Sequence, residues 1–110
     1  ETDNTVATAV YRIVQEALTN VLRHAQATEV SVSLQCEDQV LVVQIIDDGQ
    51  GFDPSLEEHA QGFGLTGMQE RANLVGGTIV FDSSPGQGTR VLCRMPVTGL
   101  EVDNKIMEAV

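Results

Sequence analysis

The spacing of apolar residues changes twice along this chain, and this change constrains the fold more than any other feature of the sequence. Residues 2–28 carry apolar side chains three and four positions apart, which is typical of a long amphipathic helix. Residues 29–36 alternate between apolar and polar, and after a short turn residues 40–47 are expected to form the second strand of a hairpin. A second helix is expected over 62–77 and a second pair of strands over 78–97. The apolar stripe of the first helix comprises Val6, Val10, Ile13, Val14, Ala17, Leu18, Val21, Leu22 and Ala25.

The order of these elements predicts an α+β fold, a two-layer sandwich of helices on a sheet. We expect one domain over residues 1–97, followed by a tail or short helix over 98–110. Residues 53–61 are polar, lack a clear period and are flanked by glycines, so they predict a mobile loop. We call this segment (residues 53–61) the lid.

Acidic residues dominate the charge of the chain. There are 16 Asp and Glu against 6 Lys and Arg, which gives a formal net charge of −10. Because binding to a phosphate backbone needs clustered basic side chains, this balance argues against nucleic acid and anionic membranes as partners. It still allows ATP, since Mg²⁺, backbone N–H groups and one or two cations can hold phosphates locally.

The two cysteines, Cys36 and Cys93, share strand positions with Val and Leu, so both are expected to be small buried side chains without a disulfide. Reduced thiols suit the cytoplasm. The sequence begins without Met and shows no signal-peptide pattern. We therefore expect a soluble piece of a longer protein, whose parent could be anchored in a membrane.

A column of polar residues stands beside the apolar stripe of the first helix. It comprises Glu16, Asn20, Arg23 and His24. These positions are i, i+4, i+7 and i+8, so one helix face presents them together. At ~100° per residue, the first three fall within a wedge of roughly 60°, and the histidine lies between that wedge and the core. Two interpretations stay open: a solvated face with a Glu–Arg attraction, or the edge of a binding site.

An acid ends the apolar face of the strand over 40–47. Alternation places Asp47 on that face and Asp48 on the other, and it places Thr89 of the last strand facing inward. A carboxylate at the edge of a core needs hydrogen-bond donors. Asp47 and Thr89 together could read the edge of a flat base that carries an exocyclic amine. Because Asp-Asp-Gly is also common turn chemistry, two acids that merely cap a turn remain the alternative.

Glycines surround this acid and precede the second helix. Gly49 and Gly51 permit a tight turn close to a ligand, while Gly62 and Gly64 lead into a helix whose N-terminal N–H groups can face phosphate. The stretch "GFGLTG" is neither the dinucleotide-binding fingerprint nor a P-loop. Both common nucleotide motifs are therefore absent from the sequence.

Three ordered stretches resemble the ATP-binding domain of sensor histidine kinases, in the superfamily that also holds gyrase, Hsp90 and MutL. "QEALTNVLRHA" resembles the N box, "DDGQGF" the first glycine box and "GFGLTGMQERANLVGG" the second, the last being most similar to the nitrate/nitrite-sensor type. The likeness covers nearly the whole chain. It implies a Bergerat-type fold, with a mixed, mainly antiparallel sheet covered on one face by helices.

The resemblance also implies roles for individual residues. Asn20 would coordinate the Mg²⁺ that bridges the phosphates, and Glu16 would position water or act as a base. Arg23 would contact phosphate, and His24 would pack near the ribose and adenine. Asp47 would accept a hydrogen bond from the adenine amine, with Thr89 in its water network. The remaining cofactor-binding positions implied are Gly49, Gly51, Gly62, Gly64, Leu65 and Gly67.

The resemblance implies partners that lie outside this chain. The γ-phosphoryl group would pass to a histidine on a separate dimerisation domain of the same protein, and then to an aspartate of a response regulator. The fragment is expected to be monomeric and its parent a homodimer. Glu57 and Glu58 of the lid would repel phosphate, so we expect them to face solvent or the partner domain.

Three alternatives stay open at this point. The first is an anti-sigma-factor-like protein kinase of the same fold, and the second is a gyrase- or MutL-like ATPase in which Glu16 activates water. The third is a Ca²⁺ loop at Asp47, Asp48 and Asp53, although the EF-hand spacing is absent.

Overall fold

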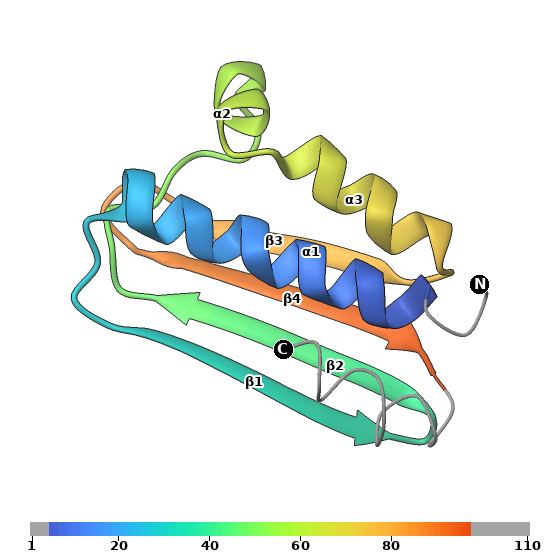
Figure 1. Cartoon of the computed structure of the whole chain (residues 1–110). Coiled ribbons are helices and arrows are strands. Elements are labelled where there is room, and N and C mark those ends of the chain that lie inside the picture. The colour runs from blue at the N-terminus through green and yellow to red at the C-terminus, as the bar shows by residue number, and fades with distance from the viewer. Residues whose placement is uncertain (1–4, 98–110) are drawn as a thin grey trace.

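The computed structural model describes residues 5–97, and the predicted tail over 98–110 lies outside them (Figure 1). The helices are α1 (Thr5–Asn20), the π-helical turn η2 (Val21–Ala25), α2 (Glu57–Gly62) and α3 (Leu65–Leu74). The strands are β1 (Val30–Glu37), β2 (Val40–Asp47), β3 (Thr78–Ser83) and β4 (Thr89–Pro96).

The four strands form one sheet in the order β1-β2-β4-β3, and each neighbouring pair is antiparallel. Figure 1 shows α1 and α3 side by side on one face of this sheet. The predicted two-layer α+β sandwich is therefore confirmed. Within residues 5–97 no helix combines the length and the apolar character needed to cross a membrane.

The core lies between α1, α3 and the two central strands. Ile13 of α1 and Met68 of α3 are almost fully buried against the inward faces of β2 and β4. Burial of a side chain of this size stabilises a fold by about 1.5–3 kcal/mol. The buried strand residues are Leu41, Val43 and Ile45 of β2 with Val91, Cys93 and Met95 of β4. The alternation predicted from the sequence is confirmed for both strands.

The expectation that both cysteines are buried is wrong for Cys36. Cys93 on the central strand β4 is fully buried, and desolvation raises the pKa of its thiol to about 12. Cys36 is exposed, although its pairing with Leu41 gives it the same face of the sheet. The reason is that β1 lies at the edge of the sheet, beyond the cover that the helices provide.

Two further local expectations are corrected. Leu22 was placed on the apolar stripe, but it is 86% exposed. It follows Ile13 by nine residues, so at ~100° per residue it points to the opposite side of the helix. The sequence predicts a mobile loop for the lid, but most of α2 (Glu57–Gly62) lies within it. His59 anchors this short helix, since its Nδ1 accepts a hydrogen bond from the Asp53 N–H at 3.1 Å.

The turn between β3 and β4 presses against the end of β2 and fixes it. Gly88 has φ of +74°, and a Cβ there would lie 2.4 Å from the backbone oxygen of Asp47. Gly86, two residues earlier, has φ of +82° but open space around it. Substitutions at these two glycines therefore distinguish the cost of backbone strain from the cost of steric overlap.

We expect Gly86→Ala to lower the free energy of unfolding by about 1–2 kcal/mol, the cost of a left-handed backbone for a residue with a Cβ. Gly88→Ala should cost about 1–3 kcal/mol more, because the end of β2 must move to admit the methyl group. Urea unfolding of both variants measures this difference. Equal losses would contradict the close approach of Gly88 to β2.

Candidate functional site

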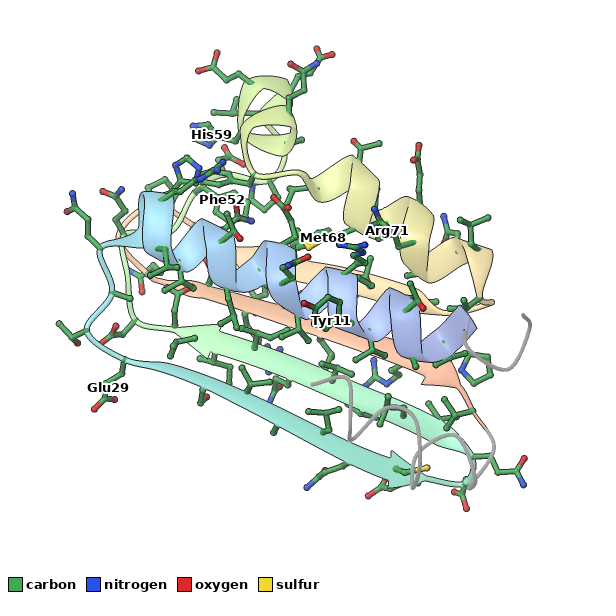
Figure 2. The ribbon with its side chains drawn as sticks, viewed as in Figure 1. Tyr11, Glu29, Phe52, His59, Met68 and Arg71 are labelled. Carbon is green, nitrogen blue, oxygen red and sulfur yellow. The ribbon has the colours of Figure 1, made fainter. Side chains whose placement is uncertain are left out.

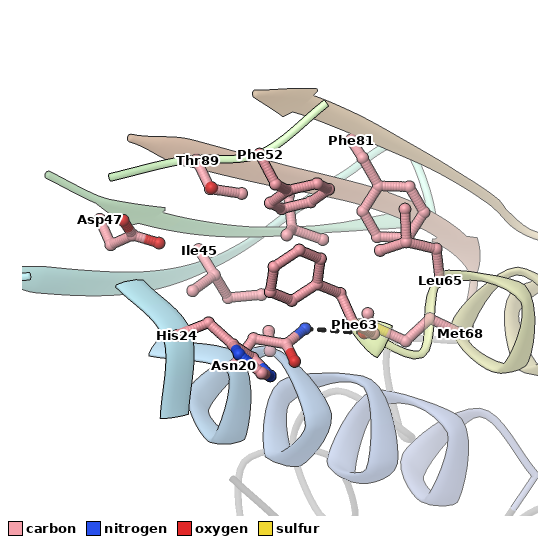
Figure 3. Close-up of a pocket in the computed structure, with 13 residues that line it drawn as sticks. Asn20, His24, Ile45, Asp47, Phe52, Phe63, Leu65, Met68, Phe81 and Thr89 are labelled. Carbon is pink, nitrogen blue, oxygen red and sulfur yellow. Dashed lines mark hydrogen bonds between the residues drawn. The ribbon is translucent and has the colours of Figure 1, made fainter. Parts of the chain in front are cut away.

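A pocket lies between the helices α1, η2 and α3 and the strands β2, β3 and β4, beside the loop that follows β2 (Figure 3). Its apolar lining residues are Ala17, Ile45, Phe52, Phe63, Leu65, Met68, Phe81 and Val91, and its polar or small ones are Asn20, His24, Asp47, Gly51 and Thr89. Six of these were predicted from the sequence, namely Asn20, His24, Asp47, Gly51, Leu65 and Thr89. The structure therefore brings together residues from both ends of the chain.

Asp47 supplies the carboxylate at one end of this pocket. It is 9% exposed and lies directly opposite Thr89 in the pairing of β2 with β4. Its Oδ1 accepts a hydrogen bond from the Gly49 N–H at 2.8 Å. Within residues 5–97 this is the one hydrogen bond that the carboxylate receives, so acceptor capacity is left for a ligand.

The hydroxyl of Ser83 fixes the orientation of Thr89. Ser83 Oγ donates to the Gly88 backbone oxygen at 2.8 Å and accepts from the Phe52 N–H at 2.9 Å. It also lies 2.9 Å from Thr89 Oγ1. Because a hydroxyl has a single proton, Thr89 must be the donor in that last bond. Thr89 then offers an acceptor lone pair, so Asp47 and Thr89 both favour a ligand edge or a water that donates.

Asn20 ties α1 to the lid side of the pocket. Its Nδ2 donates to the backbone oxygen of Phe63 at 2.8 Å, which is the dashed bond in Figure 3. An amide has a donor end and an acceptor end, so this bond leaves Oδ1 free to act as an oxygen ligand. Next to it, the His24 backbone oxygen accepts a hydrogen bond from Gln50 Nε2, which joins η2 to the loop after β2.

The ring of Phe63 fills the middle of the pocket, between His24 and Phe52 (Figure 3). Its centroid lies 4.2 Å from the ring of Phe52 and 4.5 Å from that of His24, and His59 of α2 approaches at 5.8 Å. The remaining cavity measures about 20 Å³. That volume holds about one water molecule. A flat base does not fit in this volume, so we expect Phe63 to move out of the pocket when a base enters.

The acids that follow Asp47 serve the local structure. Asp48 points away from the pocket and binds Thr28 and Glu29, whose N–H groups donate to its Oδ1 at 2.9 and 3.0 Å. Its hydrogen bond from the Thr28 hydroxyl is the main reason why its pKa is lowered. Asp53 binds Ser55, which lowers the pKa of that carboxyl too. Because each carboxylate has a separate partner, the arrangement does not fit a shared Ca²⁺ loop.

A groove of about 330 Å³ opens between α1 and α3, beside the pocket. It contains Glu16, Gly64 and Gly67 of the predicted residues. A Cβ on Gly64 would lie 2.8 Å from Glu16 Oε2, so the glycine lets the carboxylate approach the start of α3. Its full lining is Arg12, Gln15, Glu16, Gly64, Gly67, Met68 and Arg71.

Three predicted residues line neither the pocket nor this groove. Arg23 is exposed on η2, Gly62 is the exposed last residue of α2, and Gly49 acts through its N–H on Asp47. The lid acids Glu57 and Glu58 are exposed, as expected.

Several residues of the site were not found by sequence reasoning. Phe63 stands between Gly62 and Gly64, and the sequence indicates a role only for those glycines. Ser83 lies within the stretch 78–97, which the sequence predicts as a pair of strands without indicating a role for this hydroxyl. Arg12 carried a usable signal, because it stands four residues before Glu16 and eight before Asn20, and so extends the same column.

Comparison with known proteins assigns this chain to a family. A family model described as "Histidine kinase-, DNA gyrase B-, and HSP90-like ATPase" matches residues 5–99. The chain belongs to this family. Within it the chain is of the histidine kinase type, an ATP-binding catalytic domain, because the relatives described next are histidine kinases.

The oxygen sensor histidine kinase NreB of Staphylococcus carnosus (strain TM300) is 45% identical over 96 residues, which cover 87% of this chain and 28% of that protein. The crystal structure of the ATP-binding domain of PrrB from Mycobacterium tuberculosis matches with a TM-score of 0.68 and 26% identity, over 84% of this chain and 69% of that one. The histidine kinase domain of the blue-light activated histidine kinase from Erythrobacter litoralis EL346 matches with a TM-score of 0.62 and 25% identity, over 82% and 47%. The chain thus spans less than a third of the length of its curated relative.

We expect Phe63→Ala to speed the association of ATP several-fold, because the ring no longer has to leave the pocket before the base enters. Phe63→Leu is the matched control, since it keeps apolar bulk and should change the rate less. Stopped-flow mixing with a fluorescent ATP analogue measures both rates. Slower association of the alanine variant would mean that the ring contacts the nucleotide instead of competing with it.

Proposed function

We propose that this domain binds Mg-ATP and presents the γ-phosphate to a histidine on a separate dimerisation domain of the same protein, in a two-component signalling system. The observation that carries the proposal is the buried carboxylate of Asp47 opposite Thr89, at the end of an otherwise apolar pocket. Two acceptors in an apolar slot match the exocyclic amine of adenine. Guanine presents a carbonyl oxygen at that position, which a carboxylate would repel.

The residues of the site fit a magnesium ion. The amide oxygen of Asn20 is a hard ligand of the kind that Mg²⁺ takes, and phosphate oxygens and water complete such a shell. When bound, the ion neutralises phosphate charge. Within residues 5–97 no three His, Cys, Asp or Glu side chains cluster as a protein-only metal site, which agrees with an ion held mainly by the nucleotide.

The phosphate chain would run from the pocket toward the groove between α1 and α3. Glu16 stands one helical turn before Asn20 and faces that groove, where it can orient the accepting group or take its proton. Backbone N–H groups at the start of α3, beside Gly64 and Gly67, would add to the stabilisation of the phosphates. Arg23 is proposed as an additional, exposed phosphate contact.

The acceptor and the downstream partner lie outside this chain. Its histidines are His24 in the pocket wall and His59 in α2, and both rings pack against Phe63. We propose that neither is the phosphoacceptor. A response regulator would take the phosphoryl group from the dimerisation domain. We further propose a cytoplasmic location, a homodimeric parent protein and a monomeric isolated domain.

We expect Asp47→Asn to weaken ATP binding about 10- to 100-fold, since a hydrogen bond to a charged acceptor is worth about 1.5–3 kcal/mol. Asp48→Asn is the matched control, because it makes the same change one residue away on the exposed face. Calorimetric titration with a non-hydrolysable ATP analogue measures both, beside GTP. Equal affinities for the two variants would refute the adenine assignment.

Asn20 offers a test of the metal role. Asn20→Asp keeps an oxygen ligand but loses the donor to Phe63, whereas Asn20→Ala loses both. We expect the alanine variant to lose about tenfold more ATP affinity with Mg²⁺ than with EDTA, and the aspartate variant to keep its Mg²⁺ dependence. The same titration of the wild type and both variants, with and without Mg²⁺, gives the six affinities. Equal losses in both conditions would contradict a metal ligand at this position.

A further inference from the structure

Two arginines face each other across the groove between α1 and α3. Arg12 comes from α1 and Arg71 from α3, and both line the groove that contains Glu16. Figure 2 shows Arg71 on the side of α3 that faces α1. In a chain with a formal charge of −10 and only six Lys and Arg, this gives one groove a third of all the cationic side chains.

Neither guanidinium is neutralised within the part of the chain that the structure describes. The one salt bridge there joins Arg90 to Asp82, on β4 and β3. Arg12 donates a long hydrogen bond of 3.3 Å to Gln15 along its own helix, and its guanidinium carbon lies 5.8 Å from the centre of the Tyr11 ring. Neither of these partners is charged. Two like charges across a groove repel each other unless an anion lies between them. Glu16 supplies one negative charge there, so the groove retains a net positive charge.

The groove adjoins the nucleotide pocket. Met68 lines both, and the pairs Glu16–Ala17 and Gly64–Leu65 each place one residue in the groove and the next in the pocket. Along α1, Arg12, Glu16 and Asn20 form one column with a spacing of four residues, about 6 Å per step. A phosphate chain that leaves the pocket past Asn20 therefore runs toward Arg12 and Arg71.

We infer that Arg12 and Arg71 bind the terminal phosphate of ATP from opposite sides of this groove, an inference that rests on the proposed function. A guanidinium donates two parallel N–H bonds to phosphate, and two of them from separate helices hold one phosphate in a fixed position. Glu16 lines the same groove, so the acid that orients the acceptor borders the group to be transferred. The pair distinguishes ATP from ADP, which has no phosphate that reaches the groove.

The test compares the affinities for Mg-AMP-PNP and Mg-ADP by calorimetric titration of the 110-residue chain. We expect Arg12→Ala and Arg71→Ala each to weaken Mg-AMP-PNP binding about tenfold and to change Mg-ADP binding less than twofold. Arg12→Lys and Arg71→Lys should restore part of the loss, because charge is kept but the paired donors are not. Arg94→Ala, on the other face of the sheet, removes the same charge and should leave both affinities unchanged.

The outcomes distinguish a failure of this inference from a failure of the proposed function. If the wild-type chain binds both nucleotides and the arginine variants keep its affinity ratio, the arginine assignment is wrong and the nucleotide site stands. If the wild-type chain binds neither nucleotide, the proposed function fails and this inference fails with it. Because both side chains are exposed, the variants should fold normally, which circular dichroism checks.

Discussion

The pairing of β2 with β4 is the constraint on which the site depends. Its register sets Asp47 directly opposite Thr89, and the close approach of Gly88 to the Asp47 backbone holds that end of the sheet. A slip of one residue would turn the carboxylate away from the pocket and expose the apolar face of β2 to water. The burial of Leu41, Val43 and Ile45 therefore stabilises the same register that positions the acid.

The side-chain amide of Asn20 connects the helical side of the site through its donor and its acceptor atoms. Asn20 donates its N–H to the Phe63 carbonyl and keeps its oxygen for another partner, so this one side chain joins α1 to the segment between α2 and α3 at the pocket. The aromatic contacts of Phe63 with His24 and Phe52 add to this closure. These contacts are lost when the pocket opens, and the free energy of ligand binding must offset that loss.

Much of this arrangement is visible in the sequence. The spacing of Glu16 and Asn20 placed them on one helix face, and alternation turned Asp47 and Thr89 inward, as the structure confirms. Alternation failed to predict the exposure of Cys36, because it indicates on which face of the sheet a residue lies and not whether a helix covers that face. Alternation could not indicate that Phe63 fills the pocket, since that depends on contacts of Phe63 with Asn20 and His24, which are distant in the sequence.

The sequence by itself determined the type and order of the two main helices and the four strands, the face on which the strand side chains lie, and the residues of the nucleotide motifs. These follow from the covalent periodicities of helix and strand, which act within a few residues. The tertiary structure alone decided which faces are covered, which strand lies at the edge, and that Arg12 and Arg71 share one groove. Those properties arise from packing between segments distant in the chain, and no local spacing encodes them.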